Sequence, residues 1–391
     1  MGKFQYKHYL LVLLTIVAAF NYLDRGILAL AMESIKQEFQ LSDSQLGLMS
    51  GFAFALFYAV AGVPIARWAD RGNRNHVVAL TTGLWSLMVA ISGLVGSFTQ
   101  LLLVRVGVAV GESGCVPPAQ SLLADYFDRA ELPRAMAIYW MSSPLSIILA
   151  YLVGGWLVEQ VGWRMTFIII GLPGILLALL VKFTLREPRL QQDRTAGITA
   201  SIKLDSKGKS EQISLIVVLK TLWQKQTFRH VSMAYCVFMF FVAGIGVWIP
   251  TFFIRTHGMQ AGELGTWLAF TWGFGGLLFT YLGGVLATRY TARREGRQMK
   301  GVALLCLLCS IFYIFCYLSS NKYLALLFVS LAAGGLLPMT NAPFYAALQS
   351  LVEERMRAVA LALILMFSNL IGLGLGPLAV GLLSDALAPS L

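Results

Sequence analysis

Four charged side chains stand inside stretches of sequence that are otherwise apolar, and they have the most scope for chemistry. Asp24 and Arg25 are adjacent within the first long apolar run, and Arg105 and Glu112 lie seven residues apart within the fourth. Charged groups at membrane depth are costly, and they commonly mark an ion or proton pathway. A carboxylate holds a proton more or less readily according to its burial and its distance from a cation. A movement of the helices could therefore cause such a carboxylate to bind a proton and release it again.

Helical geometry places these residues for joint action. A spacing of seven is two helical turns, so Arg105 and Glu112 share one face about 10 Å apart. If the first and fourth runs cross the membrane in opposite directions, Asp24 and Glu112 reach overlapping depths. We predict that Asp24 and Glu112 carry a proton and that Arg25 and Arg105 compete for them. The alternative is a pair of static ion pairs that only hold the helices together.

The rest of the composition describes the elements that must position these groups. The chain has 391 residues, of which 58% are hydrophobic and 13% charged, and its mean hydropathy is +0.72. A soluble domain of this size could not bury so much apolar surface, so we expect an all-α protein that crosses the membrane many times. Eleven runs are long enough to span: 8–32, 43–67, 76–97, 99–124, 134–160, 163–184, 229–255, 262–288, 299–319, 322–350 and 356–386.

A polar stretch divides the runs into two sets. Residues 186–228 are rich in charged, Ser, Gly and Gln residues, which predicts a cytoplasmic linker, and 213–225 suits a helix lying in the membrane interface. Residues 1–185 then form a six-helix half, and residues 229–391 form a second half with five spans. Two pseudo-symmetric halves with a path between them are a transporter architecture. A twelfth helix is expected to be absent from this chain.

The basic residues predict an orientation. With the N-terminus in the cytoplasm, 24 of the 30 Lys and Arg residues fall on the cytoplasmic side, four fall outside and two lie in the membrane. This bias follows the positive-inside rule and predicts a multi-pass protein of the cell inner membrane. The net charge of +11 therefore reports topology. It does not indicate nucleic-acid binding, which needs a clustered basic face on a folded domain.

The turn after the second run carries a recognisable motif. Residues Ala66 to Arg74 resemble the G-x-x-x-D-R-x-G-R-R signature of the major facilitator superfamily, with Asp70, Arg71 and Arg74 matching and Ala66 in place of the first glycine. A carboxylate between arginines at a tight turn can make charge-assisted hydrogen bonds to neighbouring helix ends. We predict a cytoplasmic latch that forms in one conformation and breaks in another. A simple positive anchor is the alternative.

A finer resemblance, to spinster transporters, covers nearly the whole chain. Its motifs are Asn21-Tyr22-Leu23-Asp24-Arg25, Arg105 with Gly107, Gly111 and Glu112, Trp248-Ile249-Pro250, Asn341-Ala342-Pro343 and Gly372 to Pro377 with Ser384-Asp385. The chain resembles a bacterial homologue of this family. The resemblance implies a major facilitator fold, sphingolipid or lysophospholipid substrates and proton coupling.

The second half contributes a different kind of surface. Its spans carry aromatic and neutral polar groups where the first half carries charges. A cavity charged on one wall and apolar on the other suits an amphiphile. Our candidates for lining it are Tyr22, Trp248, Asn341, Phe344 and Asn369. The alternatives are export of lipophilic drugs or other small organic solutes, and a lipid uniporter or scramblase.

The sequence lacks the residue patterns that enzymes, metal sites and nucleotide-driven pumps need. The four histidines lie near predicted membrane edges without the partners that hydrolysis or acyl transfer needs. Cys306 and Cys309 have no second pair to complete a metal site, and no phosphate-binding loop occurs. We therefore expect no enzyme, metal or cofactor. The expected partners are a small amphiphilic substrate, protons and membrane lipids, with the chain acting as a monomer.

Overall fold

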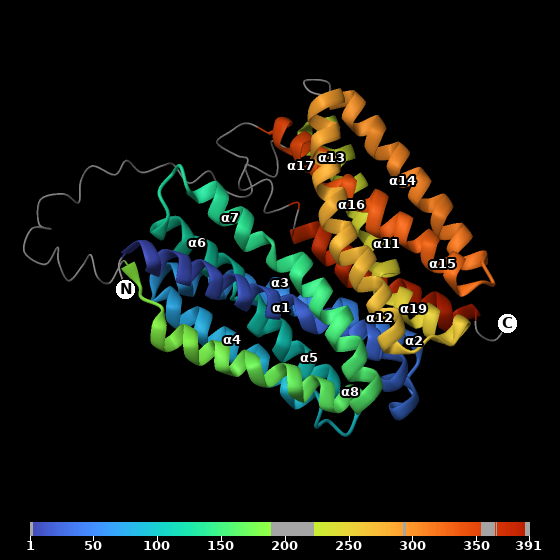
Figure 1. Ribbon diagram of the computed structural model, residues 1–391, viewed down its shortest axis with the longest axis horizontal. Coiled ribbons are helices and arrows are strands. Elements are labelled where there is room, and N and C mark those ends of the chain that lie inside the picture. The colour runs from blue at the N-terminus through green and yellow to red at the C-terminus, as the bar shows by residue number, and fades with distance from the viewer. Residues whose placement is uncertain (1–2, 189–222, 292–294, 353–363, 365, 388–391) are drawn as a thin grey trace, which may run out of the picture.

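The computed structural model describes residues 3–188, 223–291, 295–352, 364 and 366–387, and every regular element in these ranges is helical (Figure 1). The first half contains α1 (Lys3–Phe39), α2 (Asp43–Gly47), η1 (Leu48–Phe52), α3 (Ala53–Arg71), α4 (Arg74–Ser92), α5 (Phe98–Ser113), α6 (Val116–Tyr126), α7 (Leu132–Trp140) and α8 (Ser142–Thr184). The second half contains α11 (Gln226–His257), α12 (Ala261–Leu268), η2 (Ala269–Gly275), α13 (Gly276–Thr291), α14 (Glu295–Leu318), α15 (Lys322–Val329), η3 (Ser330–Leu336), α16 (Leu337–Met339), α17 (Asn341–Ser350), η5 (Leu370–Leu375) and α19 (Gly376–Leu387). The η segments are π-helical.

Ten helices in the described ranges are long and apolar enough to cross a membrane. One of them, Leu132–Thr184, has 53 residues and is interrupted at Gly162, where φ is 78° and ψ is 164°. Only glycine adopts that conformation readily, so the chain doubles back there and makes two passes (Figure 1). The described spans therefore match the predicted runs, including the break between 134–160 and 163–184. The last described span is Met366–Leu387.

The predicted linker and its interfacial helix lie almost wholly outside the described residues. The division into residues 1–185, 186–228 and 229–391 therefore stays a prediction. Glu187 lies next to the predicted boundary between the first half and the linker, and it is buried. The chain is thus packed against the first half at least to this residue.

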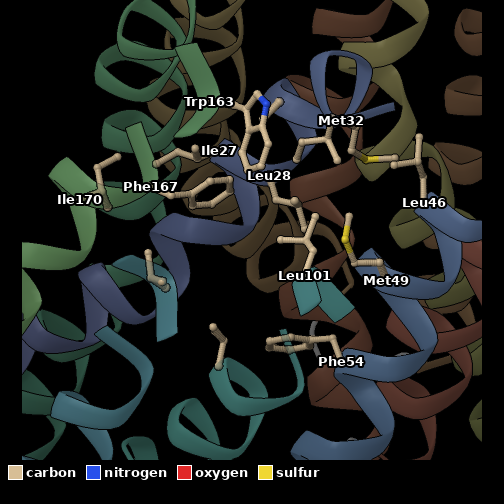
Figure 2. Close-up of a cluster of buried hydrophobic side chains, with 14 of the residues drawn as sticks. Ile27, Leu28, Met32, Leu46, Met49, Phe54, Leu101, Trp163, Phe167 and Ile170 are labelled. Atoms are coloured by element: carbon tan, nitrogen blue, oxygen red, sulfur yellow. The ribbon is translucent and has the colours of Figure 1, made fainter. Parts of the chain in front are cut away.

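A buried apolar cluster around the middle of α1 holds that helix in place (Figure 2). Dispersion contacts of this kind, more than hydrophobic expulsion from water, hold helices together in a bilayer. The cluster flanks the part of α1 that carries Asp24 and Arg25. Its labelled members are Ile27, Leu28 and Met32 of α1, Leu46, Met49 and Phe54 of the second span, Leu101 of α5, and Trp163, Phe167 and Ile170 of α8.

The two halves meet at one end of the molecule, which we name the closed end and define by Phe39, Asp43 and Arg255. Two of the helix crossings in this contact depend closely on glycines. Between α8 and α12, a Cβ added to Gly265 would lie 2.1 Å from the carbonyl oxygen of Tyr151. Between α2 and α19, a Cβ added to Gly47 would lie 2.5 Å from the carbonyl oxygen of Pro377. No side chain fits at either position in this packing.

The ribbons of the two halves diverge toward the opposite end, which holds the N-terminus of α1 (Figure 1). There α1, α4 and the second part of α8 run away from α13 and α14. Each half is thus tied to its partner at the closed end while its other end is held by contacts of its own. Such a shape suits rocking of one half against the other.

Candidate functional site

The structure joins the four predicted charged residues into two ion pairs between α1 and α5. Arg105 Nη1 donates a hydrogen bond to Asp24 Oδ2 at 2.5 Å. Arg25 donates to Glu112 Oε2 from Nη2 at 2.5 Å and from Nε at 3.2 Å. The two-turn spacing on α5 sets its two groups against adjacent residues of α1. Each carboxylate is therefore bound by the arginine of the other helix.

Burial makes this site unusual. Asp24, Arg105 and Glu112 are at most 1% exposed. The side chain of Arg25, in contrast, is 28% exposed. Ion pairs removed from solvent are stable only when their remaining hydrogen-bonding capacity is also satisfied. Arg25 is the one member of the set that a bound molecule can reach without displacing its neighbours.

That capacity is not satisfied here. Asp24 Oδ1 and Glu112 Oε1 have no hydrogen-bond donor in the described part of the chain, and neither amide atom of the fully buried Asn21 has a partner there. Asp24 is the chain neighbour of Arg25, which is the partner of Glu112, so the two ion pairs lie side by side. That Asp24 and Glu112 carry a proton stays a prediction.

Aromatic rings surround the guanidinium group of Arg25. Its Cζ lies 4.6 Å from the ring centre of Phe54, 5.2 Å from that of Tyr22 and 5.7 Å from that of Tyr58. Cation–π contacts of this kind contribute about 0.5–2 kcal/mol each. Tyr22 thus borders the charged site, and its part in lining a substrate cavity stays a prediction. Phe54 and Tyr58 were missed, because nothing distinguishes them from other aromatics in an apolar run.

The other cavity candidates lie in the second half. Trp248 is 7% exposed and donates from Nε1 to the carbonyl oxygen of Pro377 at 2.9 Å. Phe344 is also 7% exposed, with its ring stacked on Tyr235 at 4.4 Å between centres. Asn369 is exposed, and Asn341 is partly exposed at the start of α17. In this conformation Trp248 and Phe344 serve packing, and Asn341 and Asn369 remain accessible.

The residues of the motif after the second span differ in their exposure to solvent. Asp70 and Arg71 are exposed at the end of α3, whereas Arg74 is fully buried at the start of α4. Arg74 forms ion pairs with Asp125, at 2.6 Å, and with Glu187. These contacts join α4, α6 and the segment after α8 within the first half. The carboxylate for which the contact was predicted, Asp70, lies at the exposed end of α3, and the latch stays a prediction.

A second charged network closes the molecule between the halves. Asp43 at the start of α2 accepts hydrogen bonds from Arg255 Nη1 and Nη2, both at 2.8 Å, and from Lys36 Nζ at 2.6 Å. In return Asp385 of α19 accepts from the backbone N–H groups of Asp43, at 2.9 Å, and Ser44, at 2.8 Å. Lys36 and Arg255 are two of the four basic residues that the predicted topology places outside. The network was not predicted, because Asp43 and Arg255 lie 212 residues apart in the chain.

Within the residues described, no group of three or more His, Cys, Asp and Glu side chains is arranged to hold a metal ion. Two helical halves that meet at one end, with buried ion pairs inside one of them, define the protein as a membrane transporter with two pseudo-symmetric halves. The model of the family described as "Major Facilitator Superfamily" matches residues 14–377 of this chain. The chain belongs to this superfamily, and the predicted fold class is confirmed.

Individual relatives refine this placement. The chain is 33% identical over 388 residues to a protein of Mycolicibacterium smegmatis named "MFS-type efflux pump", covering 97% of this chain and 84% of that protein. It is 25% identical over 354 residues to a probable galactarate/D-glucarate transporter of Bacillus subtilis. The match covers 85% of this chain and 76% of that protein. A crystal structure of a bacterial homologue of the human lysosomal transporter Spinster, in an inward-facing and unoccupied conformation, superposes with a TM-score of 0.83 at 31% identity, covering 98% and 84%. The spinster resemblance is confirmed.

Proposed function

We propose that this protein is a proton-coupled secondary transporter that moves an amphiphilic, lipid-like substrate by alternating access. The substrate class is a lysophospholipid or a sphingolipid-related molecule. The protein acts as a monomer in the inner membrane, with its N-terminus in the cytoplasm. The closed end then faces outward, and the diverging ends face the cytoplasm.

The observation that supports coupling is the pair of buried carboxyl groups, Asp24 and Glu112, each bound to the arginine of the facing helix. When a proton adds to Glu112, its ion pair with Arg25 loses the negative charge that held it. The partly exposed guanidinium group of Arg25 is then available for an anionic group of the substrate. Loss of the proton restores the ion pair and expels the substrate. Proton binding and substrate binding are linked through this one cation.

The substrate class follows from the surroundings of Arg25. A cation fixed on aromatic rings binds a phosphate or carboxylate, and the adjoining apolar surface accepts a hydrocarbon chain. The resemblance to spinster transporters, which implies sphingolipid or lysophospholipid substrates, supports a lipid-like substrate. The efflux-pump relative supports a second candidate, export of a lipophilic organic solute with an acidic group. Both candidates need the same cation, and they differ in the size of the apolar part.

Transport by purified protein in sealed liposomes tests the proposal. A labelled lysophospholipid is followed with and without an imposed pH gradient, for wild type, Asp24→Asn and the control Asp128→Asn. Asp128 is an exposed acid in the segment between α6 and α7, so the control variant makes the same change of charge away from the charged site. We expect gradient-driven accumulation in wild type and control, and none in Asp24→Asn.

The other outcomes are equally informative. Equilibration that ignores the gradient would show a uniporter or scramblase and would reduce Asp24 to a structural ion pair. No movement of lysophospholipid, with gradient-driven movement of a lipophilic drug, would replace the substrate class and retain the coupling. Accumulation that survives in both Asp24→Asn and Glu112→Gln would remove these residues from the proton pathway.

A further inference from the structure

A cavity of about 310 Å³ lies outside the charged site, where α1, α7 and the segment after α6 meet. It belongs to the end of the first half that is remote from the closed end, since it includes residues near the start of α1. Its lining combines charged and apolar groups. The lining residues are His8, Leu11, Phe127, Ala130, Glu131, Arg134, Ala135 and Ile138.

The apolar and basic groups of the cavity are segregated. Leu11, Phe127 and Ala135 are buried and form its inner part, whereas His8 and Arg134 are exposed and border it. The volume lies at the small end of the roughly 300–1,000 Å³ range of ligand pockets. It therefore suits a compact polar group attached to a short apolar segment, and it is too small for a whole lipid.

The charge balance of the cavity is positive. Glu131 accepts hydrogen bonds from Lys7 Nζ at 2.6 and 2.8 Å. Since Lys7 donates to it, the pKa of Glu131 is lowered, so the carboxylate stays charged and occupied by the lysine. Arg134 has no acidic partner among the described residues. Its guanidinium group is accordingly the cation that the cavity offers to a ligand, with His8 beside it.

The position of the cavity identifies the source of that ligand. Glu131 lies directly before the span Leu132–Thr184, and His8 lies in the first turns of the span that begins at Tyr6. The cavity is therefore at a membrane surface, on the side where 24 of the 30 basic residues gather in the predicted topology. Anionic lipids are attracted to such surfaces, and basic pockets between transmembrane helices bind their headgroups.

We propose that this cavity binds the headgroup of an anionic phospholipid from the surrounding leaflet. Arg134 binds the phosphate, His8 contacts the headgroup beside it, and Leu11 and Ile138 contact the first carbons of the acyl chains. The bound lipid joins the start of α1 to the start of α7, two elements that must move together when the first half rocks. This site is independent of the proposed substrate and of proton coupling.

Native mass spectrometry of the full-length protein tests the proposal. The protein is released from nanodiscs that contain equal amounts of phosphatidylglycerol and phosphatidylcholine, and the retained lipids are counted. The variants are Arg134→Gln, Arg134→Lys and the control Arg129→Gln, an exposed arginine of the same segment that does not line the cavity. Wild type and Arg129→Gln are expected to retain phosphatidylglycerol preferentially. Arg134→Gln should reduce that retention at least fivefold, and Arg134→Lys should restore part of it.

Three results would overturn the proposal. Equal retention of the two lipids by wild type would show that no anionic site exists. An equal loss in Arg134→Gln and Arg129→Gln would show a diffuse basic surface instead of a site. Displacement of the lipid by millimolar inorganic phosphate would assign the cavity to a soluble anion. None of these readouts depends on transport, so their failure is separate from a failure of the proposed function.

Discussion

Asp43 and Arg255 come from opposite halves of the chain and meet in a two-pronged ion pair, with both guanidinium nitrogens 2.8 Å from the carboxylate oxygens. Asp43 is 3% exposed, and burial in the interface limits competition from water. The planar fork of arginine fits a carboxylate in this way, whereas lysine offers only a point charge. The pair must separate before the closed end can open.

We predict that Asp43→Asn shifts the protein toward a conformation open at this end. A hydrogen bond to a charged group contributes roughly 1.5–3 kcal/mol, so the ratio of open to closed molecules should rise about tenfold or more. The distance between spin labels on Leu94 and Tyr323, two exposed residues of opposite halves, measures that ratio after the native cysteines are replaced. Pulsed electron resonance should show a longer distance gaining weight.

The control for this prediction is Glu38→Gln at the same end. Glu38 pairs with Arg164 at 2.7 Å, but both residues belong to the first half. It should leave the distance distribution unchanged. If both variants lengthen the distance equally, a general change in surface charge explains the result and the specific role of Asp43 is wrong.

The fold could be predicted from the sequence because its main signals are local. Long apolar runs mark the spans, and the basic residues between them predict the topology without any tertiary information. The chain reversal at Gly162 was readable as a gap between two runs. Asp24, Arg25, Arg105 and Glu112 could be selected for a similar reason, since a charge in an apolar run is conspicuous wherever it folds.

The remaining parts of the site depend on contacts across large sequence distances. Asp43 and Arg255 lie 212 residues apart, and each is an ordinary charge near the end of a span. Asp125 and Glu187 became recognisable only as the partners of a buried Arg74. The pairing between the helices, in which Arg105 binds Asp24 and Arg25 binds Glu112, depends on the rotation of α1 relative to α5. No periodicity specifies that rotation.

The crossing of α8 and α12 provides a second prediction. Gly265→Ala places a Cβ 2.1 Å from the carbonyl oxygen of Tyr151, which is backbone and cannot rotate away. Overpacking costs about 1–3 kcal/mol, so the closed end should be destabilised and the same label pair should report opening. Gly246→Ala on α11 is the matched control, because a Cβ there meets nothing within 4 Å. An unchanged distance in Gly265→Ala would show that the packing of α8 against α12 accommodates the added Cβ without opening the closed end.

Arg74 provides a prediction about stability. Its guanidinium group is fully buried between Asp125 and Glu187, so Arg74→Ala removes the positive charge that Arg74 supplies to the buried Glu187. Removing one partner of a buried ion pair costs about 3–5 kcal/mol, and the exposure of Asp125 places the expected loss near the lower figure. Thermal unfolding of the protein in detergent should show a clear fall in Tm. Arg71→Ala, at an exposed position three residues earlier, should change it little.

The proposed role of Asp24 and Glu112 as joint proton carriers predicts a specific pattern of non-additivity. If Asp24 and Glu112 hold one proton between them, either Asp24→Asn or Glu112→Gln removes the acceptor pair and abolishes proton movement. The double variant should then be no worse than either single variant, since residues that act as one unit lose their function at the first substitution. Proton uptake per substrate, measured with a pH-sensitive dye inside liposomes, should fall to background in all three. Residual uptake in the single variants that disappears only in the double variant would show two independent proton sites, each controlled by its own arginine.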